Sequence, residues 1–397
     1  MSLPRSEALR KGLMVLLLYV ASGLFWASPA HAQSCPDFVI EGFGRNTTGG
    51  CGGTVYTVTN LHDTGPGSLR EFVQYRSGRR IIKFAVSGWI TLNGDLNIKN
   101  PDVTIDGSDA PNGGIGIRNS TLNILTNNVI VRHVRLRIGP GLAGYPRPKA
   151  VNGDALRITG QNAFNVVLDH VSISWGLDEN ISIVNGARDV TVQWSIISEG
   201  LNCNRTNPHP KICHSRGLLI NDRPTDITLH HNLWLHNAGR NPDINSGDVD
   251  VVNNLVYNGG SVSGVVIEMW QPIRANIVGN YFKGGESFSS RKHKHSVRVH
   301  DAKVNDAQVY LFGNLGYERP SDDLPQQQIF PYRDSEGKHY VPARHNFPPV
   351  TTTTASQARH EVLAHAGATL PCRDAVDLRL IDEGSRGTAT DLKTIVP

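Results

Sequence analysis

The sequence predicts an all-β protein: a right-handed parallel β-helix with a short N-terminal capping helix and an irregular C-terminal tail. From about Val55 to Tyr317, short β-branched runs alternate with Gly, Asn and Asp, and helical periodicity is nearly absent. Within this region one unit recurs, an alternating apolar strand, a polar pair and a second apolar run, as in "VVLDHVSISWG" and "ITLHHNLWLHN". Five such units start 22 to 37 residues apart, at Val129, Val166, Val190, Ile227 and Val249. This spacing suits the coils of a solenoid with insertions, whereas turns in a sandwich recur about every 8–12 residues.

The first 32 residues are predicted to be a signal peptide. Arg5, Arg10 and Lys11 precede an apolar run, and "AHA" ending at Ala32 offers the small residues of a cleavage site. The run is short for a membrane span, so we expect a secreted, extracellular protein with no membrane attachment after cleavage. A lipobox at Cys35 is a rival interpretation, which the preceding Ala-Gln-Ser fits poorly.

The charge balance limits the classes of partner. The chain has 39 Lys and Arg and 35 Asp and Glu, and three bases and one acid fall in the signal segment, so the remainder carries a net charge of +2. This value argues against a general nucleic-acid or membrane surface, and it leaves room for a local basic groove that binds an acidic polymer.

Five cysteines follow the signal segment. The short separations suggest two disulfides, Cys35 with Cys51 and Cys203 with Cys213, and leave Cys372 unpaired. A zinc cluster is the weaker alternative, because no Cys-x-x-Cys spacing occurs.

The elements at the two ends and at the turns follow from local signals. Ser68 with Glu71 three residues later forms a capping box, which predicts a short helix over the open N-terminal end of the solenoid. Asparagines at one position of the repeated unit should stack their amides along the axis: Asn232, Asn254, Asn280 and Asn314. Beyond Tyr317 the repeat fails, and "ASQARHEVLAHAGA" has helical spacing with a stop at Gly367. We therefore expect a β-helix domain over 33–317, a tail over 318–397 that packs along the coils, and a monomer.

Acids and bases cluster in neighbouring units. Asp154, Asp178 and Glu179 lie in two successive coils and would repel one another in a shared groove unless a cation compensated them, which suits Ca²⁺. Glu179 contributes only if the backbone bends, because adjacent strand residues point to opposite faces. Arg216 and Arg240 follow downstream and could bind a carboxylated chain by bidentate contacts. Further basic residues that could lie near this groove are Arg147, Lys149 and Arg274.

At these residues the chain resembles the pectate lyase family, polysaccharide lyase family 1. The segments that carry the resemblance are "VTNLHDTGPGSLREFV", "VVLDHVSIS", "DVTVQWSII", "ITLHHNLWLHNAGRNP" and "VDVVNNLVYN", spread over about residues 40 to 317, and "VLAHAGATLPCRDAVD" is similar to the tails of secreted bacterial members. The resemblance implies a right-handed parallel β-helix that cleaves pectate (polygalacturonate) by β-elimination with Ca²⁺ bound between enzyme and substrate.

The resemblance also implies roles for single residues. Asp154 and Asp178 fall at calcium-binding acids, Arg240 at the catalytic arginine, and Arg216 near a substrate-binding basic residue, with His214 as a further substrate-binding candidate. Three positions depart from the family pattern: Ser182 and Asn152 stand where members have acids, and Asn245 stands where they have an arginine.

The base and the reaction class leave alternatives open. A guanidinium is scarcely ever neutral, so Arg240 either loses its proton beside other cations or stabilises charge while another group takes the C5 proton. Alternative bases are His214, His230 and His231. Rival functions are a glycoside hydrolase that uses two of Asp154, Asp178, Glu179 and Glu199, and a noncatalytic carbohydrate-binding solenoid.

Overall fold

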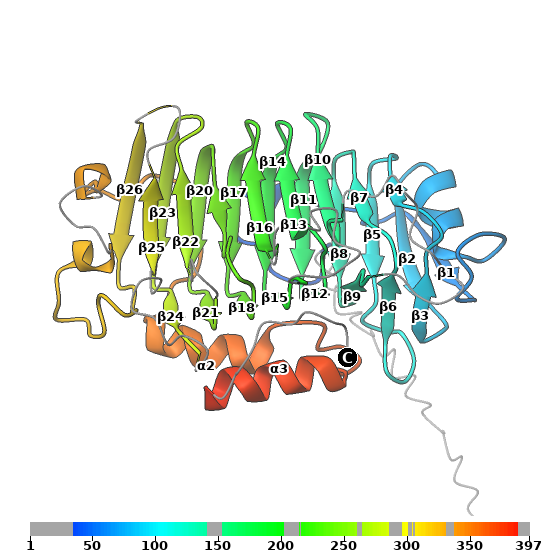
Figure 1. Cartoon of the computed structure of the whole chain (residues 1–397). Coiled ribbons are helices and arrows are strands. Elements are labelled where there is room, and N and C mark those ends of the chain that lie inside the picture. Colours follow the sequence, from blue (N-terminus) through cyan, green and yellow to red (C-terminus); the bar gives the residue numbers. More distant parts are fainter. Residues whose placement is uncertain are drawn as a thin grey trace, which may run out of the picture.

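Three parallel sheets wind into a β-helix (Figure 1). The computed structural model describes residues 35–140, 153–201, 214, 216–259, 264–285, 296–300, 304, 306–330 and 337–387. Sheet 1 consists of β1 (Thr54–Val58), β2 (Arg80–Phe84), β5 (Val103–Asp106), β8 (Val129–Arg132), β11 (Phe164–Asp169), β14 (Arg188–Gln193), β17 (Thr225–His230), β20 (Gly247–Val252), β23 (Ile273–Val278) and β26 (Ala307–Phe312).

The other two sheets complete each coil. Sheet 2 consists of β3 (Gly88–Thr91), β6 (Ile115–Arg118), β9 (Val134–Arg137), β12 (Ser172–Ser174), β15 (Ile196–Ser198), β18 (Leu233–Leu235), β21 (Leu255–Tyr257) and β24 (Tyr281–Lys283). Sheet 3 consists of β4 (Leu96–Ile98), β7 (Leu122–Ile124), β10 (Leu156–Thr159), β13 (Glu179–Val184), β16 (Arg216–Asn221), β19 (Asp243–Ile244), β22 (Val265–Glu268) and β25 (Val297–His300). The predicted fold class is confirmed.

The predicted repeat matches the register of sheet 1. The first residues of the five repeated units pair in a continuous row from β8 to β20: Val129, Val166, Val190, Ile227 and Val249. All of them point into the interior and are fully buried. Each buried aliphatic side chain contributes roughly 1.5–3 kcal/mol, and a one-residue slip would turn the whole row outward, so the apolar alternation fixes the register.

The turn from sheet 1 to sheet 2 explains the polar pairs. One residue of each turn is left-handed, as at His231 (φ 53°) and Asn253 (φ 51°), and the asparagines that follow these two, Asn232 and Asn254, are fully buried. The amide nitrogens of Asn232, Asn254 and Asn280 each donate to the next asparagine's carbonyl oxygen, at 3.1, 3.0 and 2.9 Å, and the row ends at Asn314. The predicted asparagine ladder is confirmed.

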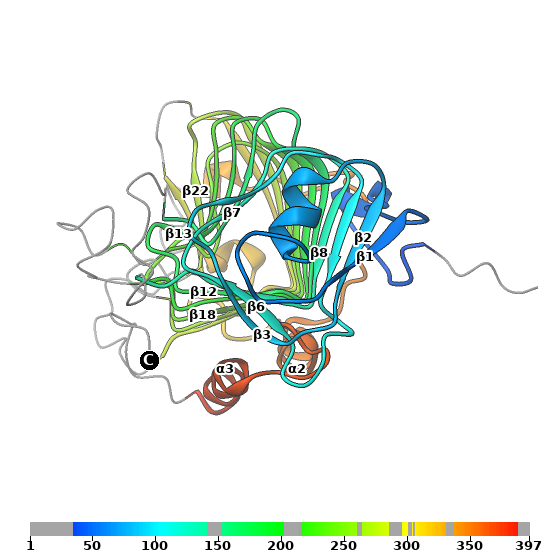
Figure 2. The same cartoon turned by 90° about the vertical axis from the view of Figure 1, so that its right-hand side faces the viewer.

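The predicted N-terminal helix lies across the end of the coils (Figure 2). It contains the wide helical turn η2 (Glu71–Tyr75), and Phe72 and Val73 close the core. The Ser68 hydroxyl accepts a hydrogen bond from the Glu71 amide at 3.3 Å, as the capping box predicts. The Glu71 carboxylate accepts from the Gly67 amide at 2.7 Å, one residue earlier than the usual box.

The two helices of the C-terminal segment lie against sheet 2 (Figure 1). The helix α2 (Ala355–His365) covers the expected segment, and Gly367 follows it in a left-handed conformation. A second helix, α3 (Ala375–Arg386), is more regular than the predicted tail; Asp374 caps its start and left-handed Gly387 ends it. Among the described residues, short 3₁₀ turns lie at η1 (Phe43–Asn46), η4 (Gln326–Ile329) and η5 (Gly337–His339).

The disulfide Cys35–Cys51 is present, with the Cα atoms 5.6 Å apart, and Cys372 is a free, exposed thiol. The predicted pair Cys203 and Cys213 and the predicted signal peptide lie outside the described residues. Among the described helices, none has the length and apolar character needed to cross a membrane.

Candidate active site

Sheet 3 brings the predicted site residues together at the N-terminal edge of its strands. Glu179 begins β13 and pairs with Arg216, which begins β16. Arg216 in turn forms a parallel bridge with Gly239 in the next coil, and Arg240, the next residue, lies beside Gly217. Asp154 precedes β10 and approaches Glu179 in the neighbouring coil, where the Asp154 carboxylate accepts a hydrogen bond from the Glu179 amide at 3.1 Å.

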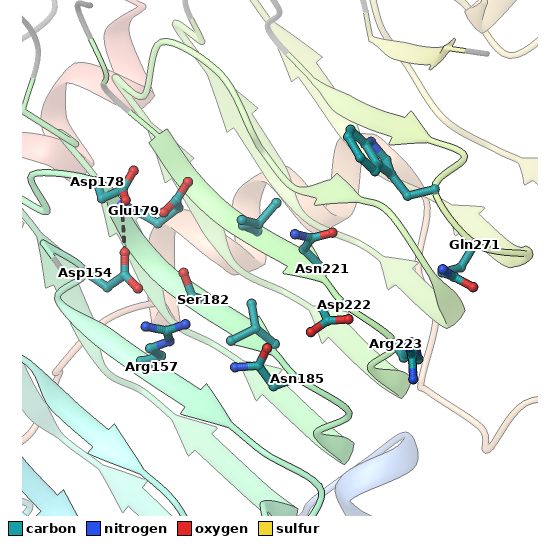
Figure 3. Close-up of a pocket in the computed structure, with 13 residues that line it drawn as sticks. Asp154, Arg157, Asp178, Glu179, Ser182, Asn185, Asn221, Asp222, Arg223 and Gln271 are labelled. Carbon is teal, nitrogen blue, oxygen red and sulfur yellow. Dashed lines mark hydrogen bonds between the residues drawn. The ribbon is translucent and has the colours of Figure 1, made fainter. Parts of the chain in front are cut away.

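Three acids converge at this edge (Figure 3). The ligand atoms of Asp178, Glu179 and His214 all lie within 4.8 Å of one another, and His214 Nε2 lies 2.6 Å from an Asp178 oxygen. The backbone bends at Asp178 before β13 begins, so the carboxylates of the adjacent residues Asp178 and Glu179 lie close together and do not point to opposite faces of the strand. Burial and the charge of Asp178 raise the pKa of Asp154 to about 7, although Ser182, Arg157 and Arg240 oppose the shift. A cation would relieve this repulsion.

Arg240 lies between two carboxylates. Its backbone is left-handed (φ 60°), and its guanidinium forms an ion pair with Glu179 and a second contact to Asp243 at 3.2 Å. Burial and the charge of Glu268 raise the pKa of Asp243 to about 7, against the effect of Arg240 and Arg216. Burial also lowers the pKa of Arg216, while Asp243 and Asp178 oppose that change. Arg216 and Arg240 therefore lie next to the acids at this edge of sheet 3.

A groove of about 640 Å³ extends from the acids along sheet 3 (Figure 3). Its lining residues are Asp154, Arg157, Asp178, Glu179, Ser182, Val184, Asn185, Leu219, Asn221, Asp222, Arg223, Trp270 and Gln271. Sequence reasoning missed Arg157, Asp243 and Trp270. The strict alternation in "LRIT" would have placed Arg157 outward beside Ser182, with which it pairs in register. No local pattern marks Trp270.

Several candidates from the sequence lie elsewhere. His230 and His231 are buried in a turn of sheet 1, where burial lowers the pKa of both, that of His231 to about 4. Glu199 is fully buried and bonds Trp175 and Arg379 at 3.0 and 2.8 Å. Arg274 pairs with Asp248 on sheet 1. Arg147, Lys149 and Asn152 lie outside the described residues. Asn245 is buried, and its side-chain amide donates to the Asn221 carbonyl oxygen at 3.4 Å.

A second group in the described part of the chain has ligand atoms at metal-binding distances: His133, Asp169 and His170. Arg132 lies 3.4 Å from His133 Nε2 and 3.5 Å from an Asp169 oxygen. Both groups contact a guanidinium, Arg132 here and Arg240 at the edge of sheet 3. The edge of sheet 3 adds a further acid, Asp154, and opens onto a groove, so it is the better metal centre.

Solved structures with the same architecture include the major cedar pollen allergen jun a 1, with a TM-score of 0.62 and 18% identity, covering 83% of this chain and 92% of that one. A pectate lyase from Bacillus sp. N165 in complex with trigalacturonate gives a TM-score of 0.55 and 20% identity, covering 83% and 98%. At these identities the likeness establishes the fold.

Curated sequences give a closer likeness, although no protein-family model matches. "Probable pectate lyase C" of Aspergillus fumigatus is 35% identical over 350 residues, which cover 86% of this chain and 74% of the relative. Its counterpart in Emericella nidulans is 34% identical over 351 residues, with the same coverage. These relatives are fungal and do not support the more specific likeness to bacterial members. Because both relatives are more than 30% identical to this chain and the matches cover 86% of it, the chain belongs to the pectate lyase family.

Proposed function

We propose that this protein is a secreted polysaccharide lyase that cleaves pectate by calcium-assisted β-elimination between C5 and C4 of galacturonate. The observation that carries the proposal is the direct contact of Arg240 with the acid cluster in an open groove. Family membership supports the reaction class, and the acidic and basic groups suit a carboxylated polymer.

The acid cluster fits a calcium ion. Asp154, Asp178 and Glu179 offer carboxylate oxygens from adjacent backbone segments, and the raised pKa of Asp154 reflects burial next to a like charge. Hard oxygen ligands with net negative charge suit Ca²⁺. These three residues would hold the ion, which when bound neutralises the substrate carboxylate and thereby acidifies the proton on C5.

The chain's own residues account for orientation and charge. Arg216 and His214 stand beside the acids and bind the substrate carboxylate. The C5 proton passes to His214, the candidate base that lies beside the acids, and negative charge develops on the C6 carboxylate. The electrons of the C–H bond then form the C4–C5 double bond, and the C4 oxygen departs with the electrons of its bond to C4 and takes up a proton. Arg240 is a cation fixed by Glu179 and Asp243, and it stabilises this charge with little rearrangement.

The organisation of the whole chain is part of the proposal. Residues 1–32 act as a signal peptide, 33–317 form the lyase domain, and 318–397 form a tail that packs on the β-helix of a monomer. The contacts of α2 with β21 and β24 support this role for the tail.

The decisive assay incubates the protein with polygalacturonate and follows the ultraviolet absorbance of unsaturated ends. We expect absorbance to rise with Ca²⁺, to stop with a chelator, and to fall at least about 100-fold in kcat for Arg240→Lys. Arg274→Lys, on sheet 1, is the matched control and should retain activity. Absorbance that persists with the chelator would remove calcium from the mechanism. Reducing ends without absorbance would favour a hydrolase, and neither signal would favour a binding protein.

A further inference from the structure

We propose that the end of the groove distant from the acids is a second recognition site, where an uncharged pyranose ring of the substrate stacks on Trp270. This site rests on the proposed function, because it binds another unit of the same polysaccharide. Nothing in the family resemblance assigns Trp270 a role.

The two ends of the groove differ in charge. Asp154, Asp178 and Glu179 gather at one end, and Arg223 and Gln271 lie away from them at the other (Figure 3). The charged residues that line the distal end are Asp222 and Arg223, neighbours in one turn, whose charges offset each other. Its other polar groups are the side-chain amides of Asn185, Asn221 and Gln271. Such a lining suits hydroxyl groups better than a series of carboxylates.

An apolar floor runs between the two ends. Ile183 and Leu218 point into the core of the β-helix, so Val184 and Leu219 face outward into the groove. Trp270 follows β22, is 40% exposed, and lines the same groove. The C–H face of a pyranose ring is apolar, and it packs on an aromatic ring while its hydroxyls bond to amides at the rim.

The surrounding contacts orient these groups. The Trp270 indole N–H donates to Glu268 at 3.2 Å, which restricts rotation of the ring. The Asn185 amide nitrogen donates to Thr159 at 2.8 Å, and its carbonyl oxygen remains an acceptor. The Asn221 carbonyl accepts from Asn245 at 3.4 Å, and its amide nitrogen remains a donor. The distal end therefore offers an aromatic platform in a groove that also presents amide donors and acceptors.

An uncharged pyranose has two sources in a pectic polymer, a methyl-esterified galacturonate in the backbone or a neutral sugar attached to it. The test compares Trp270→Ala, Trp270→Phe and wild type on de-esterified polygalacturonate, on partly methyl-esterified polygalacturonate, and on a polymer that carries neutral sugar branches. We expect Trp270→Ala to raise KM about tenfold on one of the last two, with kcat and the de-esterified substrate little changed, and Trp270→Phe to restore most of the loss. The substrate that is affected identifies the source.

Tyr75→Ala is the control, since Tyr75 is a 67% exposed aromatic in the N-terminal cap. Equal losses on all three substrates, or no loss on any, would overturn the inference, as would a failure of Trp270→Phe to restore binding while its unfolding temperature stays normal. If the wild type has no lyase activity, the proposed function fails, and calorimetric binding of the same saccharides to wild type and Trp270→Phe or Trp270→Ala still decides this site.

Discussion

Asp250 shows how a single buried acid makes stability depend on pH. It is fully buried on β20, and burial raises its pKa from 3.8 to about 6, although Arg344 and Asn276 oppose the shift. The folded protein therefore keeps a proton that the unfolded chain has lost in this range. The contribution of Asp250 to stability is complete below pH 3.8 and is lost as the pH rises through about 6.

Asp250→Asn should remove this dependence. We expect the variant to gain about 1–3 kcal/mol of unfolding free energy at pH 8 and to gain little at pH 4. Calorimetric unfolding at the two pH values measures the difference. The exposed Asp382→Asn is the control, and an equal gain at both pH values would contradict the account.

At the scale of an element, the asparagine ladder ties successive turns together. The Asn254 carbonyl oxygen accepts from the backbone and side-chain amides of Asn232, at 3.0 and 3.1 Å, and its amide donates to the Leu229 carbonyl at 2.9 Å. Asn254→Ala leaves these buried groups without partners, so we expect a loss of about 2–3 kcal/mol in chemical denaturation. Asn93→Ala, at an exposed position, should cost little; equal losses would show that the ladder adds no special stability.

The helix α3 is held by a buried ionic cluster. Arg137 on β9 donates to Asp377 at 2.8 Å and to Asp374 at 3.0 Å, and the Asp377 side chain is fully buried. Arg137→Met leaves that carboxylate without its principal partner, so we expect a loss of about 3–5 kcal/mol and faster proteolysis near α3. Arg386→Met removes an exposed pair and should cost less than about 1 kcal/mol. Unchanged proteolysis in Arg137→Met would mean that other contacts hold the helix.

At the scale of the whole molecule, calcium should link the site to global stability. The acids come from two successive coils, so an ion bound only to the folded form stabilises the whole β-helix. At 100 times its Kd it would add about 2.7 kcal/mol, seen as a rise in unfolding temperature. Asp154→Asn should lose most of this rise, whereas the exposed Asp109→Asn should keep it. A rise of equal size in Asp154→Asn would place the calcium elsewhere.

The sequence by itself determined the coils, the asparagine ladder, the N-terminal cap and the helix α2, because each depends on a short-range pattern. A row such as Val166 to Val249 cannot shift without exposing the core, so its register is fixed locally. The helix α3 also has local signals, since Asp374 caps its start and Gly387 follows its end. It lies in the C-terminal segment where the repeat has ended, so the repeat did not predict it.

Only the tertiary structure decided the partners of Arg240 and the extent of the groove. The ion pair with Glu179 and the placement of Trp270 depend on which strands lie side by side after connections of unequal length. A residue's own neighbours in sequence carry no record of that alignment. Contacts between coils therefore depend on how the coils stack. Stacking places each strand about 4.8 Å from the next along the axis, and this brings together side chains that are far apart in the sequence.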